Sequence, residues 1–364
     1  MLKMKSLLVL VLMFVCSLVF VGCGECEHNY VNGKCEKCAE AHDCKYVDGV
    51  CSCGAKEEDK GKEEKVVKVG VLQLMSHDAL GLATEGFKEG LIKAGYVENS
   101  TIEFVIKNPE GDETAMNTMA NELVRTCDIV LGNATPAAVA LQIAASNNGK
   151  KDLPILFTSV TDAVEAGLVA SNEKPGGNIT GTSDASAVED QVKLVKEVLP
   201  EAKKLGIIYN VSEVNSRVQA EAAKKQAEDL GMEVEVKTVS EAGEITSTVS
   251  QLGIDGCEAL FIPTDNLIAN NMAAVAQGAL QHKILVVAGE GSMVMNGGHI
   301  TIAVDYKKLG EQTAELAVKI LKGEKPADLA VVTQSLDELS FVANLENLEA
   351  IDVELPQSIK DKLS

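Results

Sequence analysis

Short apolar runs alternate with helical periodicity along the chain from residue 66 onwards. Val66–Leu72 is a β-rich run. Apolar residues then recur at helical spacing from Leu80 to Ala94, and Gly95 is predicted to end this helix. The same alternation predicts strands at 101–106, 128–132, 154–158, 205–209, 233–237, 259–262, 284–287, 299–303 and 340–343. It predicts helices at 112–125, 213–229, 244–252, 265–280 and 306–322, and a further helix that begins at residue 135. This pattern is typical of parallel sheets covered by helices on both faces. So many strands predict an α/β protein of two doubly wound lobes with a ligand cleft between them.

The first 22 residues predict an export signal. Lys3 and Lys5 precede an apolar run of about 16 residues, shorter than the ~20 that a membrane span needs. The run ends at Gly22-Cys23, a junction that resembles the bacterial lipoprotein box. The resemblance implies cleavage behind Gly22 and lipidation of Cys23. A plain secretion signal or an uncleaved anchor is the alternative.

Six cysteines crowd into residues 26–53, where the sequence repeats itself. Tyr-Val-Asn-Gly at 30–33 returns as Tyr-Val-Asp-Gly at 46–49, and Asn-Gly or Asp-Gly at such a place predicts a β-hairpin. Each hairpin would gather three Cys and one His, which is the ligand set of a structural zinc site. The ligand sets are Cys26, His28, Cys35 and Cys38, and then His42, Cys44, Cys51 and Cys53. Disulfides are the alternative, because an exported protein meets an oxidising compartment.

The content of charged residues argues against some classes of binding partner. The chain has 33 Lys and Arg against 54 Asp and Glu, a net charge of −21. Such a charge argues against nucleic acid or an anionic membrane face as partner, because there is no positive field to attract them. Residues 56–65 are nearly all charged and predict a solvated spacer.

Polar residues directly follow several predicted strands, and the carboxyl ends of parallel strands are where such folds bind ligands. Thr135 is predicted to be the N-cap of a helix, where its hydroxyl and the free N–H groups suit a carboxylate. Asp265 and Glu290 follow strands of the other lobe and could accept an ammonium group, or could simply cap helices. Further candidates at strand ends are Thr158, Ser159, Asp162 and Ser212. No phosphate-binding loop or nucleophile motif occurs, so an enzyme is possible but unsupported.

The order of motifs resembles the bacterial ABC-transporter substrate-binding lipoproteins of the tryptophan/tyrosine-transporter type, which have the type I periplasmic binding protein fold. The stretches that carry the resemblance are Ala134–Ala138, Ser159–Val169, Pro175–Asp184, Tyr209–Ser216, Ile262–Asn266, Ala288–Glu290 and Asp305–Tyr306. The chain departs from the family pattern at Gly81, where the family carries an Asp after His-x-Ala-Leu. The Cys/His-rich module has no counterpart that we know in the family.

The resemblance implies an extracytoplasmic receptor, lipid-anchored to the cell membrane, that delivers a small solute to a permease and an ATPase. The implied ligand is an aromatic or branched amino acid, with a small peptide or another amino-acid-like solute still open, and Asn215 joins the candidate ligand residues. A ligand sensor for a membrane signalling partner is the alternative. No cofactor is expected in the lobes, and zinc is expected only in the module.

Motif positions place crossings between the lobes near Gly181–Ser183, Ile302–Asp305 and Leu336–Leu339. The predicted organisation is a signal peptide at 1–22, an anchor and Cys/His-rich module at 23–55, a spacer at 56–65, lobe 1 at 66–182 and 304–337, and lobe 2 at 183–303 and 338–364.

Overall fold

The computed structural model describes residues 66–185 and 187–363, and four two-residue strands nearer the N-terminus. The chain divides into two units, Met1–Glu64 and Lys65–Ser364. In the first unit, β1 (Tyr30–Val31) pairs antiparallel with β2 (Lys34–Cys35), and β3 (Tyr46–Val47) pairs antiparallel with β4 (Val50–Cys51).

The predicted lipidation site and most of the predicted metal ligands lie outside the described residues. They are Cys23, Cys26, His28, Cys38, His42, Cys44 and Cys53. Cys35 and Cys51 are described only as backbone positions in β2 and β4. Lipidation, zinc and disulfides therefore stay predictions.

The first sheet of the larger unit forms lobe 1 and has the strand order β15-β9-β8-β7-β5-β6, with every pair parallel. Its strands are β5 (Val67–Gln73), β6 (Ile102–Lys107), β7 (Ile129–Asn133), β8 (Ile155–Val160), β9 (Ile179–Ser183) and β15 (Val332–Thr333). The central strands β7, β8 and β9 are buried along their whole length, as expected for a parallel sheet covered on both faces.

The second sheet forms lobe 2 and has the order β11-β10-β12-β13-β14-β16. Its strands are β10 (Lys204–Asn210), β11 (Glu233–Val239), β12 (Ala259–Ile262), β13 (Leu285–Ala288), β14 (Ile300–Ala303) and β16 (Ser340–Ala343). The expectation of purely parallel sheets is wrong for one pair, since β16 runs antiparallel to β14. The chain enters β16 directly from lobe 1 after β15, so no helical crossover on lobe 2 turns it into a parallel neighbour.

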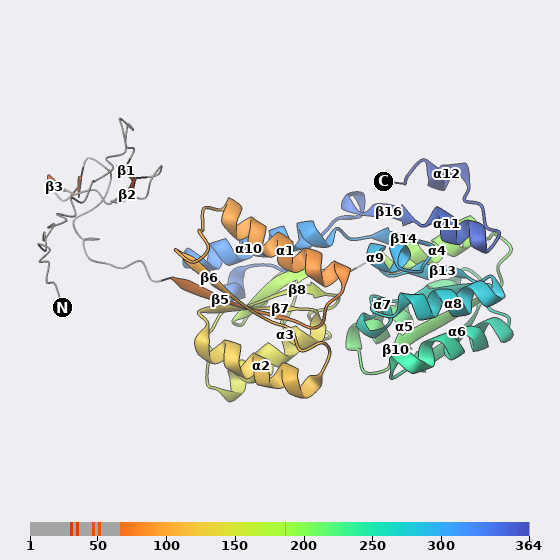
Figure 1. Ribbon diagram of the computed structural model, residues 1–364, viewed down its shortest axis with the longest axis horizontal. Coiled ribbons are helices and arrows are strands. Elements are labelled where there is room, and N and C mark those ends of the chain that lie inside the picture. Colours follow the sequence, from red (N-terminus) through yellow and green to blue (C-terminus); the bar gives the residue numbers. More distant parts are fainter. Residues whose placement is uncertain are drawn as a thin grey trace, which may run out of the picture. The chain divides into compact units, whose positions relative to one another are not determined.

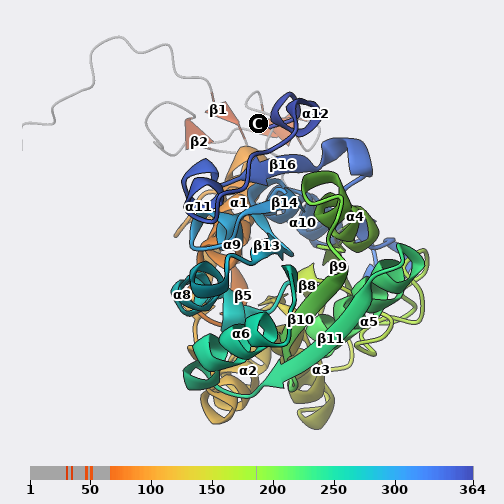
Figure 2. The same ribbon diagram turned by 90° about the vertical axis from the view of Figure 1, so that its right-hand side faces the viewer.

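Helices cover both faces of each sheet (Figure 1). In lobe 1, α2 and α3 bury one face with their apolar sides, and α1 and α10 bury the other. In lobe 2, α4 and α5 cover one face, and α6 and α8 cover the other (Figure 2). The helices are α1 (Asp78–Lys93), α2 (Glu113–Thr126), α3 (Thr135–Asn147), α4 (Val188–Val198), α5 (Val214–Asp229), α6 (Ile245–Ile254), α7 (Asn266–Ala269), α8 (Met272–His282), α9 (Gly291–Met295), α10 (Tyr306–Leu321), α11 (Leu345–Ala350) and α12 (Gln357–Lys360), with 3₁₀ turns η2 (Ala242–Glu244), η3 (Pro326–Asp328) and η4 (Leu336–Glu338).

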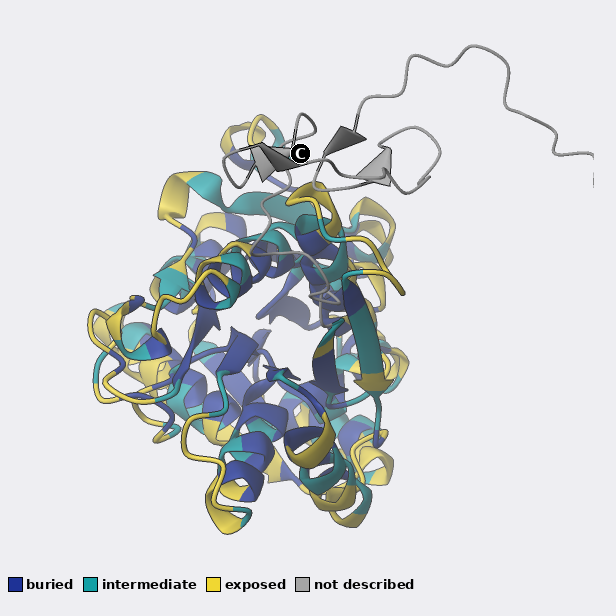
Figure 3. Cartoon of the chain, turned by 90° about the vertical axis from the view of Figure 1, so that its left-hand side faces the viewer, coloured by how far each residue is buried: buried dark blue, intermediate teal, exposed yellow. Residues whose placement is uncertain are grey.

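The apolar cores lie between these helices and the sheets, so that the inner strands are buried and the outer helix faces are exposed (Figure 3). Helices α1 and α10 approach closely because glycines face the partner backbone. A Cβ on Gly86 would collide with the Lys307 carbonyl, and one on Gly310 would collide with the Ala83 carbonyl. Since α10 comes from a distant part of the chain, this contact fixes the return of the chain to lobe 1.

Several local expectations need correction. The N-cap of α3 is Ala134 rather than Thr135, which is the first helical residue. The helix expected at 265–280 is broken into α7 and α8 at Asn270-Asn271, where the Asn271 amide donates to the Leu267 carbonyl at 2.8 Å. The sequence analysis did not predict β9 or α4.

Candidate functional site

A small enclosed cavity lies between the lobes, at the carboxyl ends of both sets of strands. Its volume is about 20 Å³. The cavity is lined by His77, Leu80, Ser159, Thr161, Asp184, Asn215, Thr264, Asp265, Asn266, Ala269, Glu290 and Tyr306. This volume has room for about one water molecule, so the lobes are closed on each other.

Hydrogen bonds across the cavity join the lobes. Nε2 of His77, before α1, lies 3.3 Å from Oδ1 of Asn266 in α7. The Thr161 and Thr264 hydroxyls, at the ends of β8 and β12, lie 3.3 Å apart. At the rim, Asn296 donates to Asp78 at 3.0 Å, and the exposed Arg217 pairs with Glu165 at 3.0 Å.

Lobe 1 carries buried polar atoms without partners, and two of the residues concerned, His77 and Ser159, line the cavity. Among the described residues, buried side-chain atoms that lack a hydrogen bond include Nδ1 of His77, Oδ1 of Asn133, Oγ1 of Thr135 and Oγ of Ser159. Unpaired buried polar atoms are costly, about 1–3 kcal/mol each. Their gathering at strand ends indicates that a ligand supplies the missing partners.

Local backbone conformation explains how Ser159 comes to face the cavity and why α3 begins without a side-chain cap. Ser159 has φ +56°, and the pairing of β8 with β9 shifts register between Phe157 and Val160. Such a bulge re-aims a side chain. Ala134 has φ +90° and offers no side-chain cap, so the first N–H groups of α3 stay available beside Thr135.

The lobe 2 wall carries carboxylates instead. Asp265 accepts hydrogen bonds from the Asn210 N–H at 2.6 Å and the Ile268 N–H at 2.9 Å. Glu290 accepts from the Ser292 N–H at 3.1 Å and its hydroxyl at 2.6 Å. Burial raises the pKa of Glu290 to about 7, and burial together with the nearby Glu213 carboxylate raises the pKa of Asp265.

The connections between the lobes contribute Asp184 and Tyr306. Asp184 accepts from the Thr161 hydroxyl at 3.1 Å and from the Tyr306 hydroxyl at 2.7 Å. Burial raises the pKa of Asp184. No ion pair in the described part of the chain reaches Asp184, Asp265 or Glu290, so acids dominate this side of the cavity.

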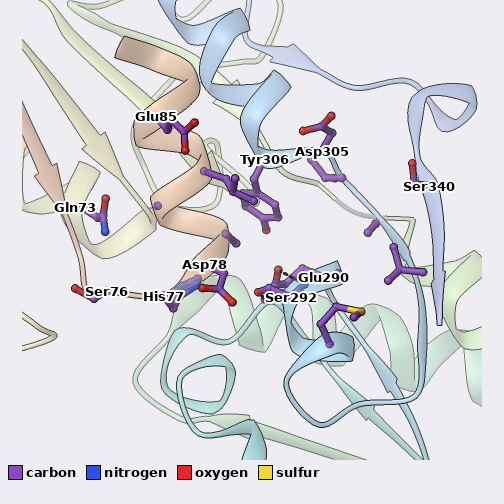
Figure 4. Close-up of a pocket in the computed structure, with 18 residues that line it drawn as sticks. Gln73, Ser76, His77, Asp78, Glu85, Glu290, Ser292, Asp305, Tyr306 and Ser340 are labelled. Atoms are coloured by element: carbon purple, nitrogen blue, oxygen red, sulfur yellow. Dashed lines mark hydrogen bonds between the residues drawn. The ribbon is translucent and has the colours of Figure 1, made fainter. Parts of the chain in front are cut away.

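A larger open groove adjoins the cavity on the hinge side. Its volume is about 980 Å³, and it shares His77, Glu290 and Tyr306 with the cavity. Figure 4 shows the Tyr306 side chain pointing from α10 towards Glu290 and Ser292. Apolar parts of the groove wall come from Leu82, Met295, Val304 and Val342.

Residues 68–362 match the family model of ABC transporter substrate binding proteins. The chain belongs to this family. It is 37% identical over 312 residues to the tyrosine-binding protein of Clostridioides difficile (strain R20291), covering 85% of this chain and 88% of the relative. The family is one of solute-binding proteins that deliver small molecules to ABC transporters, not an enzyme class, and the chain is extracytoplasmic. Among the described residues, no helix has both the length and the hydrophobicity to cross a membrane.

Solved substrate-binding proteins have the same fold. An ABC domain in complex with L-Trp from Streptococcus pneumonia has a TM-score of 0.77 and 35% identity, covering 82% of this chain and 99% of that one. The ligand-free, open structure of a substrate binding protein with adhesive properties from Clostridium difficile has a TM-score of 0.64 and 37% identity. The match covers 82% of this chain and 98% of that one. The better overlay with the ligand complex agrees with the closed lobes seen here.

The structure brings together half of the site residues expected from the sequence. Ser159, Asn215, Asp265 and Glu290 line the cavity of this substrate-binding protein. Asn215 donates to the Thr264 carbonyl at 2.9 Å, and its Oδ1 lacks a partner among the described residues.

The other four expected residues do not line the cavity. Thr135 and Thr158 are buried but are not among its lining residues, and the Thr158 hydroxyl accepts from Thr182 at 3.0 Å. Asp162 lines a different groove and accepts from the Val164 and Glu165 N–H groups. Ser212 is exposed and donates to Asn210 at 2.9 Å.

Sequence reasoning missed several lining residues: His77, Thr161, Asp184, Thr264, Asn266 and Tyr306. Asp184 and Tyr306 end or lie in motifs that carried the family resemblance, and His77 begins the loop that departs from the family pattern. Thr161, Thr264 and Asn266 lie in strand-end clusters from which neighbouring residues were selected. Attention to whole clusters would have found most of them.

Proposed function

We propose that this substrate-binding protein captures a free aromatic amino acid, tyrosine or tryptophan, between its lobes and delivers it to the permease and ATPase of an ABC importer. Relatives at 37% and 35% identity are a tyrosine-binding protein and a complex with L-Trp. The observation that carries the proposal is the polarity of the cavity, which matches the two charged ends of an amino acid.

Lobe 1 suits the carboxylate end. The unpartnered hydroxyl of Ser159 lines the cavity. The uncapped N-terminus of the 13-residue α3 adds free N–H groups after the neighbouring strand β7. Lobe 2 and the hinge suit the ammonium end, because they hold buried carboxylates without a cation. A zwitterion would satisfy both walls at once and would bridge the lobes.

The aromatic side chain would extend towards the hinge-side groove. This groove shares Glu290 and Tyr306 with the cavity, and Leu82, Met295, Val304 and Val342 give it apolar wall. Since the closed cavity has room for about one water molecule, entry of an amino acid requires the lobes to part. Cleft opening and closing is therefore part of the proposed function.

The decisive test is calorimetry of the full chain against a panel of amino acids. Tyrosine or tryptophan should bind most tightly, and Ser159→Gly, which tolerates the positive φ at this position, should weaken binding about tenfold by removing a donor to the carboxylate. Ser212→Ala is the control, since Ser212 is exposed outside the cavity. Equal losses in both variants, or tighter binding of an acidic amino acid, would contradict the proposal.

The sequence further supports a tether at the membrane. Gly22-Cys23 at the end of the apolar run is the basis for proposing that Cys23 is lipidated. Cys23→Ser should then release the protein from the membrane fraction. Unchanged fractionation of this variant would reject lipidation.

For the Cys/His-rich module we propose two zinc sites, each with three Cys and one His. Metal analysis of the reduced full chain should find about two zinc ions per chain, since each repeat offers four ligands. Absence of zinc with all six thiols oxidised would instead establish disulfides.

A further inference from the structure

Three connections join the lobes, and the second and third run side by side. The second leads from β14 of lobe 2 into α10 of lobe 1, and the third leads from β15 of lobe 1 into β16 of lobe 2. Strands β14 and β16 pair antiparallel, and their last pair towards lobe 1 is Ala303 with Ser340. Asp305 and Ser340 mark the two connections in Figure 4. Because the backbone ladder ends at that pair, side-chain contacts decide how the connections are held beyond it.

Gln334 joins the second and third connections on the lobe 1 side. Its Oε1 accepts from the Asp305 N–H at 3.0 Å, and its Nε2 donates to the Asp305 carbonyl at 2.7 Å. One side chain thus makes both hydrogen bonds that a paired antiparallel strand residue would make. We call these two bonds the Gln334 clamp. Gln334 is 5% exposed, and the preceding Thr333 pairs with Ser183 of β9, so the clamp is fixed to the lobe 1 sheet.

Further contacts attach the same two connections to helices of lobe 1. Val304 of the second connection and Leu339 of the third pack in one apolar cluster with α1 and α10. Lys308 of α10 pairs with Glu338 of η4 at 2.7 Å. This ion pair is partly exposed, so the packing and the clamp contribute more to the attachment. By their contacts, both connections therefore belong to lobe 1.

A second buried glutamine holds the second connection on the lobe 2 side. Gln191 of α4 is fully buried, and its Nε2 donates to the Ile302 carbonyl at 2.8 Å and to a carbonyl directly after β13 at 3.1 Å. Ile302 is thus fixed to lobe 2, whereas Asp305 is fixed to lobe 1. Only Ala303 and Val304 lie between them. A rotation of one lobe against the other that keeps these contacts must change the backbone angles of this short stretch.

The first connection is also held by lobe 1. Asp184 directly follows β9 and accepts from the Tyr306 hydroxyl at 2.7 Å and from the Thr161 hydroxyl at 3.1 Å. The Ser183 hydroxyl donates to the Thr161 carbonyl at 2.9 Å. Since Tyr306 and Thr161 belong to lobe 1, the first connection is fixed on the same side as the other two.

We infer that the cleft opens about a pivot at residues 303–304 and 339–340, and that Gln334 is the positioning residue that keeps the pivot there. The inference deepens the proposed function, because it assigns the residues that move with each lobe when a ligand enters. Asp184 and Tyr306, which line the cavity, stay with lobe 1, and Glu290 moves away with lobe 2.

Loss of the clamp should favour the open form through entropy. Gln334 lines neither the cavity nor the adjoining groove, so a substitution there acts through the connections and not through a ligand contact. Without the clamp the second and third connections bend independently, and the open lobes sample more orientations. Closure around a ligand then orders more of the chain, which lowers the affinity.

The first test uses L-tryptophan as its own reporter, because the chain contains no tryptophan. Calorimetry and stopped-flow fluorescence of the full chain compare wild type with Gln334→Met, which keeps the side-chain length and removes both hydrogen bonds. The freed backbone groups belong to the exposed Asp305, where water can replace them, and thermal unfolding checks the fold.

Gln334→Met should weaken tryptophan binding at least about fivefold. The loss should come from faster dissociation, with an association rate within about twofold of wild type. Gln142→Met is the matched control, since Gln142 donates to the Gly167 carbonyl at 2.9 Å within lobe 1 and outside the connections. A wild-type dissociation rate in Gln334→Met, or equal losses in both variants, would overturn the positioning role of Gln334.

Amide hydrogen exchange at single-residue resolution locates the pivot. In wild type the Asp305 N–H should be equally protected with and without tryptophan, because opening leaves its bond to Gln334 intact. In Gln334→Met this N–H should exchange at least about tenfold faster. Protection of the Asp305 N–H only in the presence of tryptophan would place the bend inside the clamp and overturn the pivot.

The same measurements separate the pivot from the proposed ligand. If neither tryptophan nor tyrosine binds, the proposed ligand is wrong. Protection of the Asp305 N–H in ligand-free wild type and its loss in Gln334→Met would still support the pivot. Tight tryptophan binding together with an unprotected Asp305 N–H in ligand-free wild type would support the ligand and overturn the pivot.

Discussion

Lobe 1 and lobe 2 place their strands in the same order, so that β5, β7 and β8 correspond to β10, β12 and β13. The corresponding strand ends carry different chemistry. His77 is the N-cap of α1 in lobe 1, and Glu213 is the N-cap of the corresponding helix α5 in lobe 2. In lobe 1, Thr135 follows β7 and Ser159 lies near the end of β8. At the corresponding places in lobe 2, Asp265 follows β12 and Glu290 follows β13.

This difference extends to the helix N-termini. In lobe 2, the side chains of Asp265 and Glu290 accept from the first N–H groups of α7 and α9. In lobe 1, neither His77 nor Ala134 offers such a cap to α1 or α3. At corresponding strand ends, one topology therefore gives a hydroxyl donor in lobe 1 and carboxylates in lobe 2, an arrangement that suits the proposed zwitterion.

The largest effect on ligand binding is expected from a substitution that places a carboxylate at the cavity in lobe 1. Ser159→Asp should weaken amino acid binding at least a hundredfold, about 3 kcal/mol or more, because a second carboxylate would face that of the ligand. Asp and Asn tolerate the positive φ of residue 159 better than most residues. Calorimetry of Ser159→Asp beside the uncharged Ser159→Asn separates charge from shape.

If the aspartate and asparagine variants bind alike, lobe 1 does not contact the carboxylate. The polarity of the cavity would then not set the orientation of the ligand.

A second prediction concerns how the buried acids of lobe 2 change the stability of the ligand-free protein. The pKa of Glu290 is about 7 against an ordinary value of 4.5, so the folded state holds this proton more tightly than the unfolded state. Ligand-free protein should therefore lose stability from this group as the pH rises from about 4.5 to about 7. By linkage the full loss is about 3 kcal/mol.

Glu290→Gln removes this loss, so its stability advantage over wild type should grow between pH 5 and pH 8. Thermal and denaturant unfolding of the ligand-free full chain measure the difference. Glu349→Gln, on the exposed side of α11, is the control and should follow wild type. A constant difference between Glu290→Gln and wild type would show that burial does not perturb Glu290.

The comparison of lobes also shows what sequence patterns predict well. Strands β12 and β16 begin and end at the expected residues, because each is a short apolar run between polar turns. Strand β9 was missed because Ile-Thr-Gly-Thr-Ser resembles a turn. Its threonines are buried because tertiary partners satisfy them, as when Thr180 donates to the Leu329 carbonyl at 2.7 Å.

Helix α4 was missed although its signal is present, with Val188, Val192 and Val195 buried at helical spacing. For the site, the sequence predicted the strand ends but not the side-chain directions. Thr161 faces the cavity, whereas the adjacent Asp162 turns away to bind backbone N–H groups. That choice depends on the local bulge and on the other lobe, which no local pattern encodes.

A third prediction compares a packing contact that both lobes share. A Cβ on Gly70 of β5 would lie 2.9 Å from Sγ of the buried Cys127, whereas one on Gly206 of β10 would lie 3.4 Å from Sγ of the buried Cys257. Gly70→Ala should therefore destabilise the protein by about 1–2 kcal/mol through overpacking. Gly206→Ala should cost less than about 1 kcal/mol, because its closest contacts, 3.3 Å from Cδ1 of Leu252 and of Leu260, need only small shifts of flexible side chains and a less flexible unfolded chain offsets part of that cost.

Denaturant unfolding of both variants measures the contrast, and Cys127→Ala added to Gly70→Ala should recover part of the loss. Equal costs at the two glycines would mean that the lobes are packed equally tightly at this contact.

The smallest expected effect concerns the rim, where Arg217 of lobe 2 pairs with Glu165 of lobe 1 at 3.0 Å. Both side chains are substantially exposed, and exposed ion pairs contribute less than about 1 kcal/mol. Arg217→Ala should weaken ligand binding by no more than about threefold in low salt and by less in high salt, because salt screens exposed charges. Glu221→Ala, which removes only the partner of Arg217 within α5, is the matched control. A tenfold loss that persists in high salt would mean that this rim contact, and not the opposed chemistry of the buried walls, holds the lobes closed.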